Sequence, residues 1–97
     1  MLSSRSKQLS RLEVQDLIVL LAVAETGSFR RAAIRLRIGQ PAVTRRIQKL
    51  EDATGVSLFE RRRSGAALTS AGTHFIARVR AIIDDIDAAL VATHSAG

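Results

Sequence analysis

The stretch GQPAVTRRIQKLE, residues 39 to 51, predicts a helix that carries polar side chains on two different faces. Pro41 stands near its first helical position, where the missing N–H of proline costs nothing. At about 100° per residue, Val43, Ile47 and Leu50 fall together and predict the buried face. The opposite face is polar and begins in the first turn. This helix is expected to span about residues 40–54.

A shorter helix is predicted just before it. Ser28 is a favoured N-cap residue, and Phe29, Ala32, Ala33 and Leu36 follow at helical spacing, which predicts one inward face. Only three residues, 37 to 39, separate this helix from the next one. This spacing is typical of a helix-turn-helix.

The polar face of the second helix has the chemistry of base recognition. In a helix-turn-helix, the N-terminal part of the second helix enters the major groove of DNA. Amide and guanidinium groups pair bidentately with adenine and guanine edges, and a threonine methyl can contact thymine. A polar helix face alone is more often simply solvated, so this interpretation depends on its flanking features. The base-reading candidates are Gln40, Pro41, Thr44, Arg45 and Gln48.

Positive charge is concentrated around this helix. The formal net charge is +6, and ten of the 15 basic residues but only three of the nine acidic residues lie between residues 28 and 64. A polyanion-binding surface requires such a concentration, and a solvated basic face is the alternative. The candidates for contacts to phosphates, including those in the wing described next, are Ser28, Arg30, Arg31, Arg46, Lys49, Arg61, Arg62 and Arg63.

Residues 58–68 predict a basic β-hairpin, or wing. A strand is expected at 58–61, a turn at 62–65 and a return strand at 66–68. Arginines fill the predicted tip. A basic wing beside a recognition helix lies over the phosphate backbone or enters the minor groove, which attracts arginine when it is narrow. A solubilising turn is the alternative.

Helices are also predicted at both ends. Residues 1–9 are expected to form a mobile arm, and Ser10 and Glu13 have the spacing of a capping box. The helix that follows would bury its apolar stripe, which consists of Val14, Leu17, Ile18 and Leu21. The winged domain is therefore expected at residues 10–68.

A long helix is predicted over residues 69–94, capped by Thr69. Its apolar stripe is too broad for one small domain to cover, which predicts pairing with the same helix of a second chain. A helix packed wholly on its own domain is the alternative. The expected dimerisation residues are Phe75, Val79, Ile82, Ile83, Ile86 and Leu90.

Composition excludes several classes of protein. The 97 residues allow one small domain, and the absence of cysteine excludes a disulfide framework and thiolate metal sites. The longest apolar run, Leu17 to Ala24, is far shorter than the roughly 18 residues of a membrane span. His74 and His94 converge with no catalytic partner, and Asp84, Asp85 and Asp87 predict a solvated face. We expect a cytoplasmic protein with no enzymatic activity, metal or cofactor.

The motifs resemble those of the N-terminal winged helix-turn-helix of LysR-type transcriptional regulators. The shared features are Gly-Ser-Phe before two alanines, Gln-Pro opening the second helix, Leu-Glu at 50 and 51, Leu-Phe-Glu-Arg at 58–61 and Leu-Thr-Ser-Ala-Gly at 68–72. The resemblance implies a mainly α fold with a two-stranded wing and a long linker helix. It also implies binding of a dimer to dyad-symmetric double-stranded DNA. A small-molecule inducer would bind only to an effector domain that is absent from this chain.

Several residue roles are implied by the same resemblance. Base or backbone contacts fall on Gln40, Pro41, Thr44 and Arg45, and wing contacts on Arg61 and Arg63. The chain departs from the family pattern where Gly39 replaces a usual Ser or Thr N-cap and where the neighbouring turn residue, Ile38, is apolar. Glycine costs only a few tenths of a kcal/mol as an N-cap, so neither departure threatens the fold.

Two alternatives share the predicted fold, one with another function and one in another family of regulators. A winged helix can serve as a protein-protein interaction module, but that role would not need Gln, Thr and Arg clustered at the front of a helix. The same DNA-binding fold also occurs in molybdate-responsive and MarR-like regulators, and the Leu-Phe-Glu-Arg motif argues against those families.

Overall fold

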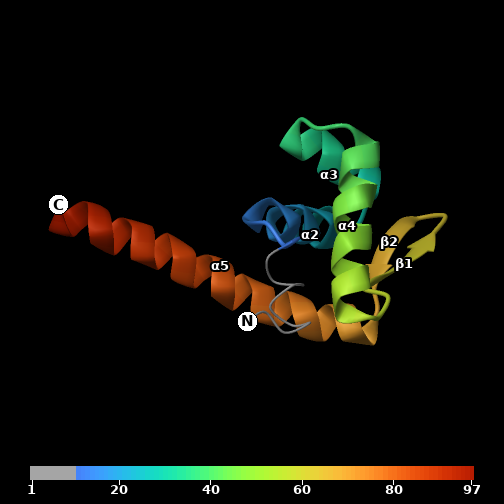
Figure 1. Cartoon of the computed structure of the whole chain (residues 1–97). Coiled ribbons are helices and arrows are strands. Elements are labelled where there is room, and N and C mark those ends of the chain that lie inside the picture. The colour runs from blue at the N-terminus through green and yellow to red at the C-terminus, as the bar shows by residue number, and fades with distance from the viewer. Residues whose placement is uncertain (1–10) are drawn as a thin grey trace.

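A computed structural model describes residues 11–97, so the predicted arm at residues 1–9 lies outside the described residues. The elements are α2 (Val14–Thr26), α3 (Phe29–Leu36), α4 (Gln40–Thr54), β1 (Phe59–Arg62), β2 (Gly65–Leu68) and α5 (Ser70–Ala96). α2, α3 and α4 pack together beside the β1–β2 hairpin, and α5 projects away from them (Figure 1). The predicted mainly α, winged helix-turn-helix fold with a long C-terminal helix is confirmed.

The start and the buried face of α2 differ from the prediction. Ser10 lies outside the described residues, and the N-cap is Glu13, whose backbone N–H donates to Asp16 Oδ2 at 2.8 Å. The predicted stripe was half wrong: Leu17 and Leu21 are partly buried against the core, but Val14 is 49% exposed and Ile18 37% exposed. α2 is apolar around most of its circumference, so periodicity alone did not determine its orientation. The face that is buried carries Asp16, Val19, Leu20, Ala22 and Val23.

The helix-turn-helix forms as the sequence predicts. Ser28 Oγ accepts a hydrogen bond from the backbone N–H of Arg31 at 3.0 Å, which confirms the cap of α3. α3 ends at Arg37, which has the left-handed backbone with φ 57°. Gly39 is the N-cap of α4, and Gly55 ends that helix with φ 75°. α4 therefore occupies the predicted residues 40–54.

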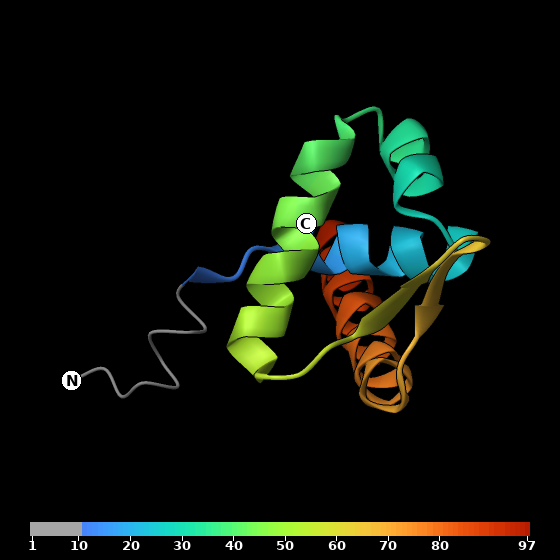
Figure 2. The same ribbon diagram turned by 90° about the vertical axis from the view of Figure 1, so that its right-hand side faces the viewer.

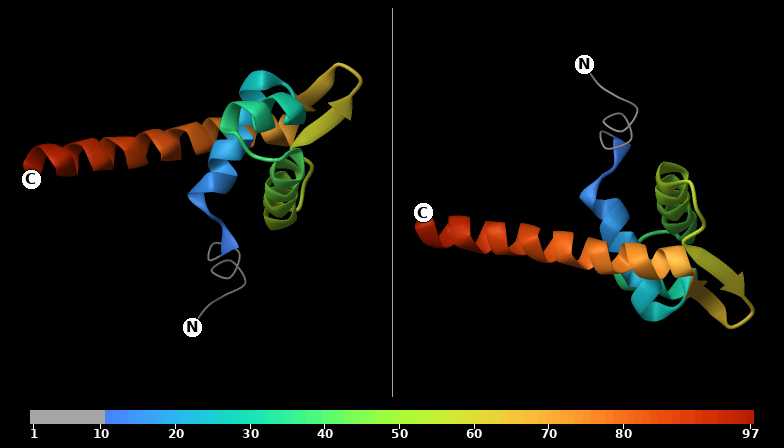
Figure 3. Two further views of the ribbon diagram at one scale, coloured as in Figure 1. Left: turned by 90° about the horizontal axis from the view of Figure 1, so that it is seen from above. Right: turned by 90° about the horizontal axis from the view of Figure 1, so that it is seen from below.

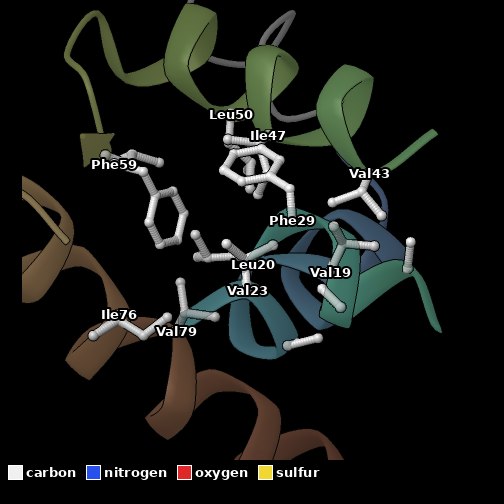
Figure 4. Packing of buried hydrophobic residues seen from close by; sticks show 14 residues of the cluster. Val19, Leu20, Val23, Phe29, Val43, Ile47, Leu50, Phe59, Ile76 and Val79 are labelled. Carbon is white, nitrogen blue, oxygen red and sulfur yellow. The ribbon is translucent and has the colours of Figure 1, made fainter. Parts of the chain in front are cut away.

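One hydrophobic core joins all of these elements. Val43, Ile47 and Leu50 of α4 are buried as predicted, against Leu20 and Val23 of α2 (Figure 4). Two aromatic rings connect the helix-turn-helix to the wing: Phe29 of α3 meets Phe59 of β1 edge to face, with ring centroids 5.9 Å apart. The core thus fixes α4 on α2 and the wing on α3.

The wing is an antiparallel hairpin with a two-residue turn. Phe59 pairs with Leu68 and Arg62 with Gly65, so each strand includes one residue that the sequence placed in the turn. Gly65 has φ 134°, and a Cβ there would overlap the carbonyl oxygen of Gly27. The N–H of Ala66 donates to that same oxygen at 2.8 Å. The return strand is therefore tied to the turn between α2 and α3.

α5 is divided between the core and the surface. Thr69 Oγ1 accepts from the N–H of Gly72 at 2.9 Å, which confirms the predicted cap. Ile76 and Val79 point into the core beside α2, and Val79 is 1% exposed (Figure 4). The prediction that Val79 faces a second chain was therefore wrong. Beyond this point α5 extends away from the wing (Figures 1 and 3), and no helix of residues 11–97 is long and apolar enough to cross a membrane.

Candidate nucleic-acid interface

α4 and the wing lie on the same side of the molecule, with α5 running away behind them (Figure 2). The predicted base-reading residues are brought together on the outward face of α4. All are exposed except Thr44, which is half-buried. They border one shallow depression, lined by Gln40, Pro41, Thr44, Arg45, Gln48, Lys49 and Asp52. Because the opposite side of α4 is held in the core, this face has a fixed orientation.

The polar groups of this face differ in their surroundings. Gln40, Pro41 and Arg45 stand exposed in the first two turns of α4. Gln48, one turn further on, donates from Nε2 to Asp52 Oδ1 at 2.9 Å, so its amide is already oriented by the helix. The first two turns therefore present their donors and acceptors to an incoming ligand most directly.

Two of the predicted phosphate-binding cations are held by a buried carboxylate. Asp16 on α2 has no exposed surface, and it accepts from Arg46 Nη1 and Lys49 Nζ, each at 2.9 Å. Both cations also lie near Glu13 Oε1, Arg46 at 3.8 Å and Lys49 at 3.3 Å. These four residues form an ion-pair cluster that joins α2 to α4.

Within the cluster, the surroundings of Asp16 and Lys49 favour the charged form of each side chain. Burial acts to raise the pKa of Asp16, but the N–H of Glu13 and the side chains of Lys49 and Arg46 outweigh it, so that this pKa lies below its ordinary value. The hydrogen bond to Asp16 holds the pKa of Lys49 above its ordinary value. Asp16 and Lys49 are therefore both charged at neutral pH.

The remaining basic candidates are on the surface of α3 and the wing. Arg30 and Arg31 are exposed on the first turn of α3, next to Ser28, and Arg63 is exposed in the turn of the hairpin. Arg62 pairs with Glu60 at 2.8 Å, but both side chains are 60% exposed, so this pair is weak and easily exchanged.

Arg61 is oriented by an aromatic ring. Its guanidinium carbon lies 4.0 Å from the centroid of the Phe29 ring, in a cation-π contact. Phe29 is in turn packed edge to face on Phe59. The first arginine of the wing is thus positioned by the same aromatic pair that joins the wing to α3.

Glu51 connects α4 to the wing. Its Oε2 accepts from the backbone N–H of Leu58 at 2.7 Å and from that of Phe59 at 3.5 Å. On the other side, Thr69 Oγ1 donates to the carbonyl of Ser57 at 2.6 Å, and its N–H donates to the carbonyl of Leu58 at 3.0 Å. The approach to β1 is therefore held from α4 and from the start of α5.

The roles of Asp16 and Glu51 were not predicted from the sequence. The burial of Asp16 could have been predicted, because Val19, Leu20 and Val23 follow it at i+3, i+4 and i+7 and place it within an apolar helix face. A carboxylate buried in such a face requires a partner. Its basic partners, Arg46 and Lys49, are 30 or more residues away in sequence, so this ion pairing could not be predicted from spacing. Glu51 was recognised only as part of a family motif, without its hydrogen bonds.

Comparison with known families agrees with this geometry. The family model described as bacterial regulatory helix-turn-helix protein, lysR family, matches residues 14–73. The chain belongs to the LysR family. The matched residues run from the first residue of α2 into the first turn of α5, so they include the whole helix-turn-helix and the wing. The resemblance identified from the sequence motifs is confirmed.

Individual LysR-family proteins are similar over most of the chain. The HTH-type transcriptional regulator ClcR of Pseudomonas putida is 47% identical over 72 residues, which are 74% of this chain and 24% of ClcR. A crystal structure of the CbnR DBD–DNA complex superposes with a TM-score of 0.83 at 38% identity, covering 88% of this chain and 98% of that one. The BenM DBD/benA site 1 DNA complex gives a TM-score of 0.84 at 31% identity, covering 89% and 100%. The chain spans about a quarter to a third of the length of the curated relatives that it matches.

Proposed function

We propose that this chain binds double-stranded DNA sequence-specifically, as the DNA-binding part of a LysR-type transcriptional regulator. The observation that carries the proposal is the exposed face at the front of α4, where an amide, a hydroxyl and a guanidinium follow the turn of a helix-turn-helix. Solved LysR-family domains of the same fold, those of CbnR and BenM, are bound to DNA. Such a role is one of binding rather than catalysis, and it is exercised in the cytoplasm.

The contacts divide into two classes. α4 would enter the major groove, with Gln40, Thr44 and Arg45 reading base edges and with Pro41 and Gln48 bordering them. The wing would lie against the backbone or in the minor groove. Phosphate contacts are assigned to half-buried Ser28 and to the exposed arginines around α4, namely Arg30, Arg31, Arg61, Arg62 and Arg63.

The outer half of α5 supports a dimer. Ile82 is 47% exposed, Ile86 37% and Leu90 65%, and they follow one another at helical spacing beyond the core. Large apolar side chains left in water along a projecting helix favour burial against a second copy. Phe75 and Ile83 are partly buried at the edge of the same stripe. Two copies joined in this way would present two α4 helices to a dyad-symmetric site.

Sedimentation tests the dimer with a matched pair of variants. Ile82→Lys should shift the chain toward monomer, whereas Ala77→Lys should leave it associated, because Ala77 is exposed on the other side of α5. A wild-type chain that stays monomeric at high concentration would overturn pairing through α5.

Binding to a randomised duplex pool, followed by selection and sequencing at several salt concentrations, tests the function. An enriched dyad motif with affinity that falls steeply in salt is the expected result. Salt-sensitive binding without an enriched motif would reduce the role of the chain to backbone binding. The absence of any binding would favour a protein-protein interaction module.

Single variants test the division of the contacts. Gln40→Ala or Arg45→Ala should cost about 1–3 kcal/mol at the selected site and relax the preference at particular base pairs. Arg31→Ala should weaken binding to all sequences alike. Indistinguishable specificity profiles for the two kinds of variant would show that the division is wrong.

A further inference from the structure

The ion-pair cluster of Glu13, Asp16, Arg46 and Lys49 is unlike the other charges of the surface. Asp16 is completely buried, and Arg46 and Lys49 retain only 29% and 31% of their side-chain exposure. Arg62 and Glu60, by contrast, form a pair whose side chains are each 60% exposed. A buried carboxylate has to stay paired, because leaving it alone in the interior is costly. The cluster is therefore a permanent feature of the fold.

The charges within the cluster balance. Two carboxylates face two cations, with both oxygens of Asp16 engaged: Oδ1 by Arg46, and Oδ2 by Lys49 and the N–H of Glu13. A neutral group of this kind adds little to the positive potential that attracts a polyanion. Exposed Arg30 and Arg31 on α3 face no such carboxylate partner among the described ion pairs.

The cluster nevertheless lies at the edge of the candidate interface. Lys49 borders the same depression as Gln40 and Arg45, and Arg45 also borders the hollow formed by the cluster itself. Arg46 and Lys49 would therefore be close enough to take part in binding if Asp16 did not hold them. Their proximity makes the carboxylate on α2 consequential for function as well as for stability.

We propose that Asp16 is a positioning residue that withholds Arg46 and Lys49 from the DNA backbone, so that they fix α4 on α2 instead of neutralising phosphates. This inference rests on the proposed DNA binding and revises the role expected for both cations from sequence. Withholding two cations lowers sequence-independent affinity, which depends on the number of phosphates neutralised. The orientation of the base-reading face is meanwhile fixed by bonds that are largely removed from solvent.

The test is the salt dependence of binding, measured by fluorescence anisotropy with the selected duplex and with a random-sequence duplex. Each phosphate contact contributes about 0.9 to the slope of log K against log salt. Lys49→Gln should leave the slope of the wild-type chain unchanged, whereas Arg31→Gln should lower it by about 0.9. A slope that falls equally in both variants would overturn the proposal.

Asp16→Asn provides the opposite test, because it removes the buried charge that holds both cations while keeping the shape of the side chain, and leaves them only the exposed carboxylate of Glu13. The slope should become steeper by about 1 to 2, and binding to the random duplex near 0.1 M salt should tighten by up to about tenfold for each released cation. The triple variant Asp16→Asn, Arg46→Gln, Lys49→Gln should return to the slope of the wild type. A purely structural role of Asp16 would give no steeper slope and no reversal.

The outcomes separate this inference from the proposed function. If the wild-type chain binds neither duplex, the proposed function fails. If it binds both with a salt-dependent affinity and Lys49→Gln lowers the slope, only the positioning role of Asp16 fails. Thermal unfolding identifies any variant that does not fold. If Asp16→Asn does not fold, the slopes of Lys49→Gln and Arg31→Gln still decide the question. Lys49→Gln should fold, because Arg46 and the N–H of Glu13 still pair with Asp16.

Discussion

Glu51 should hold the wing to the recognition helix by a measurable amount of free energy. Its carboxylate accepts from the N–H of Leu58 at 2.7 Å, just where the chain approaches β1, and Leu58 itself is fully buried. A hydrogen bond to a charged acceptor contributes about 1.5–3 kcal/mol, and one to a neutral acceptor about 0.5–1.5 kcal/mol. Glu51→Gln keeps an acceptor and should cost about 1 kcal/mol. Glu51→Ala leaves the donor unpaired and should cost about 2–3 kcal/mol.

Thermal and urea unfolding would measure this difference. In a domain of this size about 1 kcal/mol lowers the melting temperature by roughly 4–8 °C, so the two variants should be clearly resolved. Asp52→Asn is the control, since it makes the same change of charge on the neighbouring exposed residue and should stay within about 0.5 kcal/mol of the wild type. If Glu51→Gln were as costly as Glu51→Ala, the charge of Glu51 rather than its hydrogen-bond acceptor would stabilise the wing, contrary to this prediction.

Three further predictions concern backbone strain, close packing and pH. Arg37→Gly should stabilise the fold by about 0.5–1 kcal/mol in urea unfolding, because glycine removes the strain of the left-handed backbone at φ 57°. This gain should exceed the cost of the larger entropy of glycine in the unfolded chain. A loss of stability would contradict the prediction. Gly72→Ala should destabilise by about 1–3 kcal/mol, since its Cβ would overlap the carbonyl oxygen of Leu58, whereas exposed Ala77→Gly in the same helix should cost no more than about 1 kcal/mol. The lowered pKa of Asp16 means that its stabilising contribution is present above the ordinary value of 3.8 and is lost as the pH falls through the lower folded value. The stability of Asp16→Asn should therefore fall less steeply with decreasing pH than that of the wild type. Identical dependence of stability on acid pH in the two proteins would contradict this role of Asp16.

Local signals predicted the helix-turn-helix closely because they are short-range. Ser28, Pro41 and Thr69 act through backbone geometry and hydrogen bonds within a few residues, and each marks the start of a helix in the structure. The buried face of α4 was equally clear, because its few large apolar residues all fall on one side. The outward polar face of α4 followed directly from that assignment.

The terminal helices were less well predicted because their apolar residues give more than one possible face. α2 offers two stripes of similar hydrophobicity, and its packing against α4 and α5 buries the one that contains Asp16. α5 has a single broad stripe, and only the position of the other helices decides that Ile76 and Val79 enter the core while Leu90 stays exposed. Periodicity shows that a face is apolar, but not which neighbour covers it.

Local sequence patterns were enough to predict the order of the elements, the buried side of α4 and the exposed groups on that helix. Which cations remain available to a ligand depends instead on how the helices pack. Asp16 meets Arg46 across 30 residues of sequence, because the packing of α4 on α2 brings a buried carboxylate beside two basic side chains. A count of charges in the sequence does not distinguish a paired cation from an exposed one. Burial and ion pairing depend on contacts between distant elements, which a local sequence pattern does not contain.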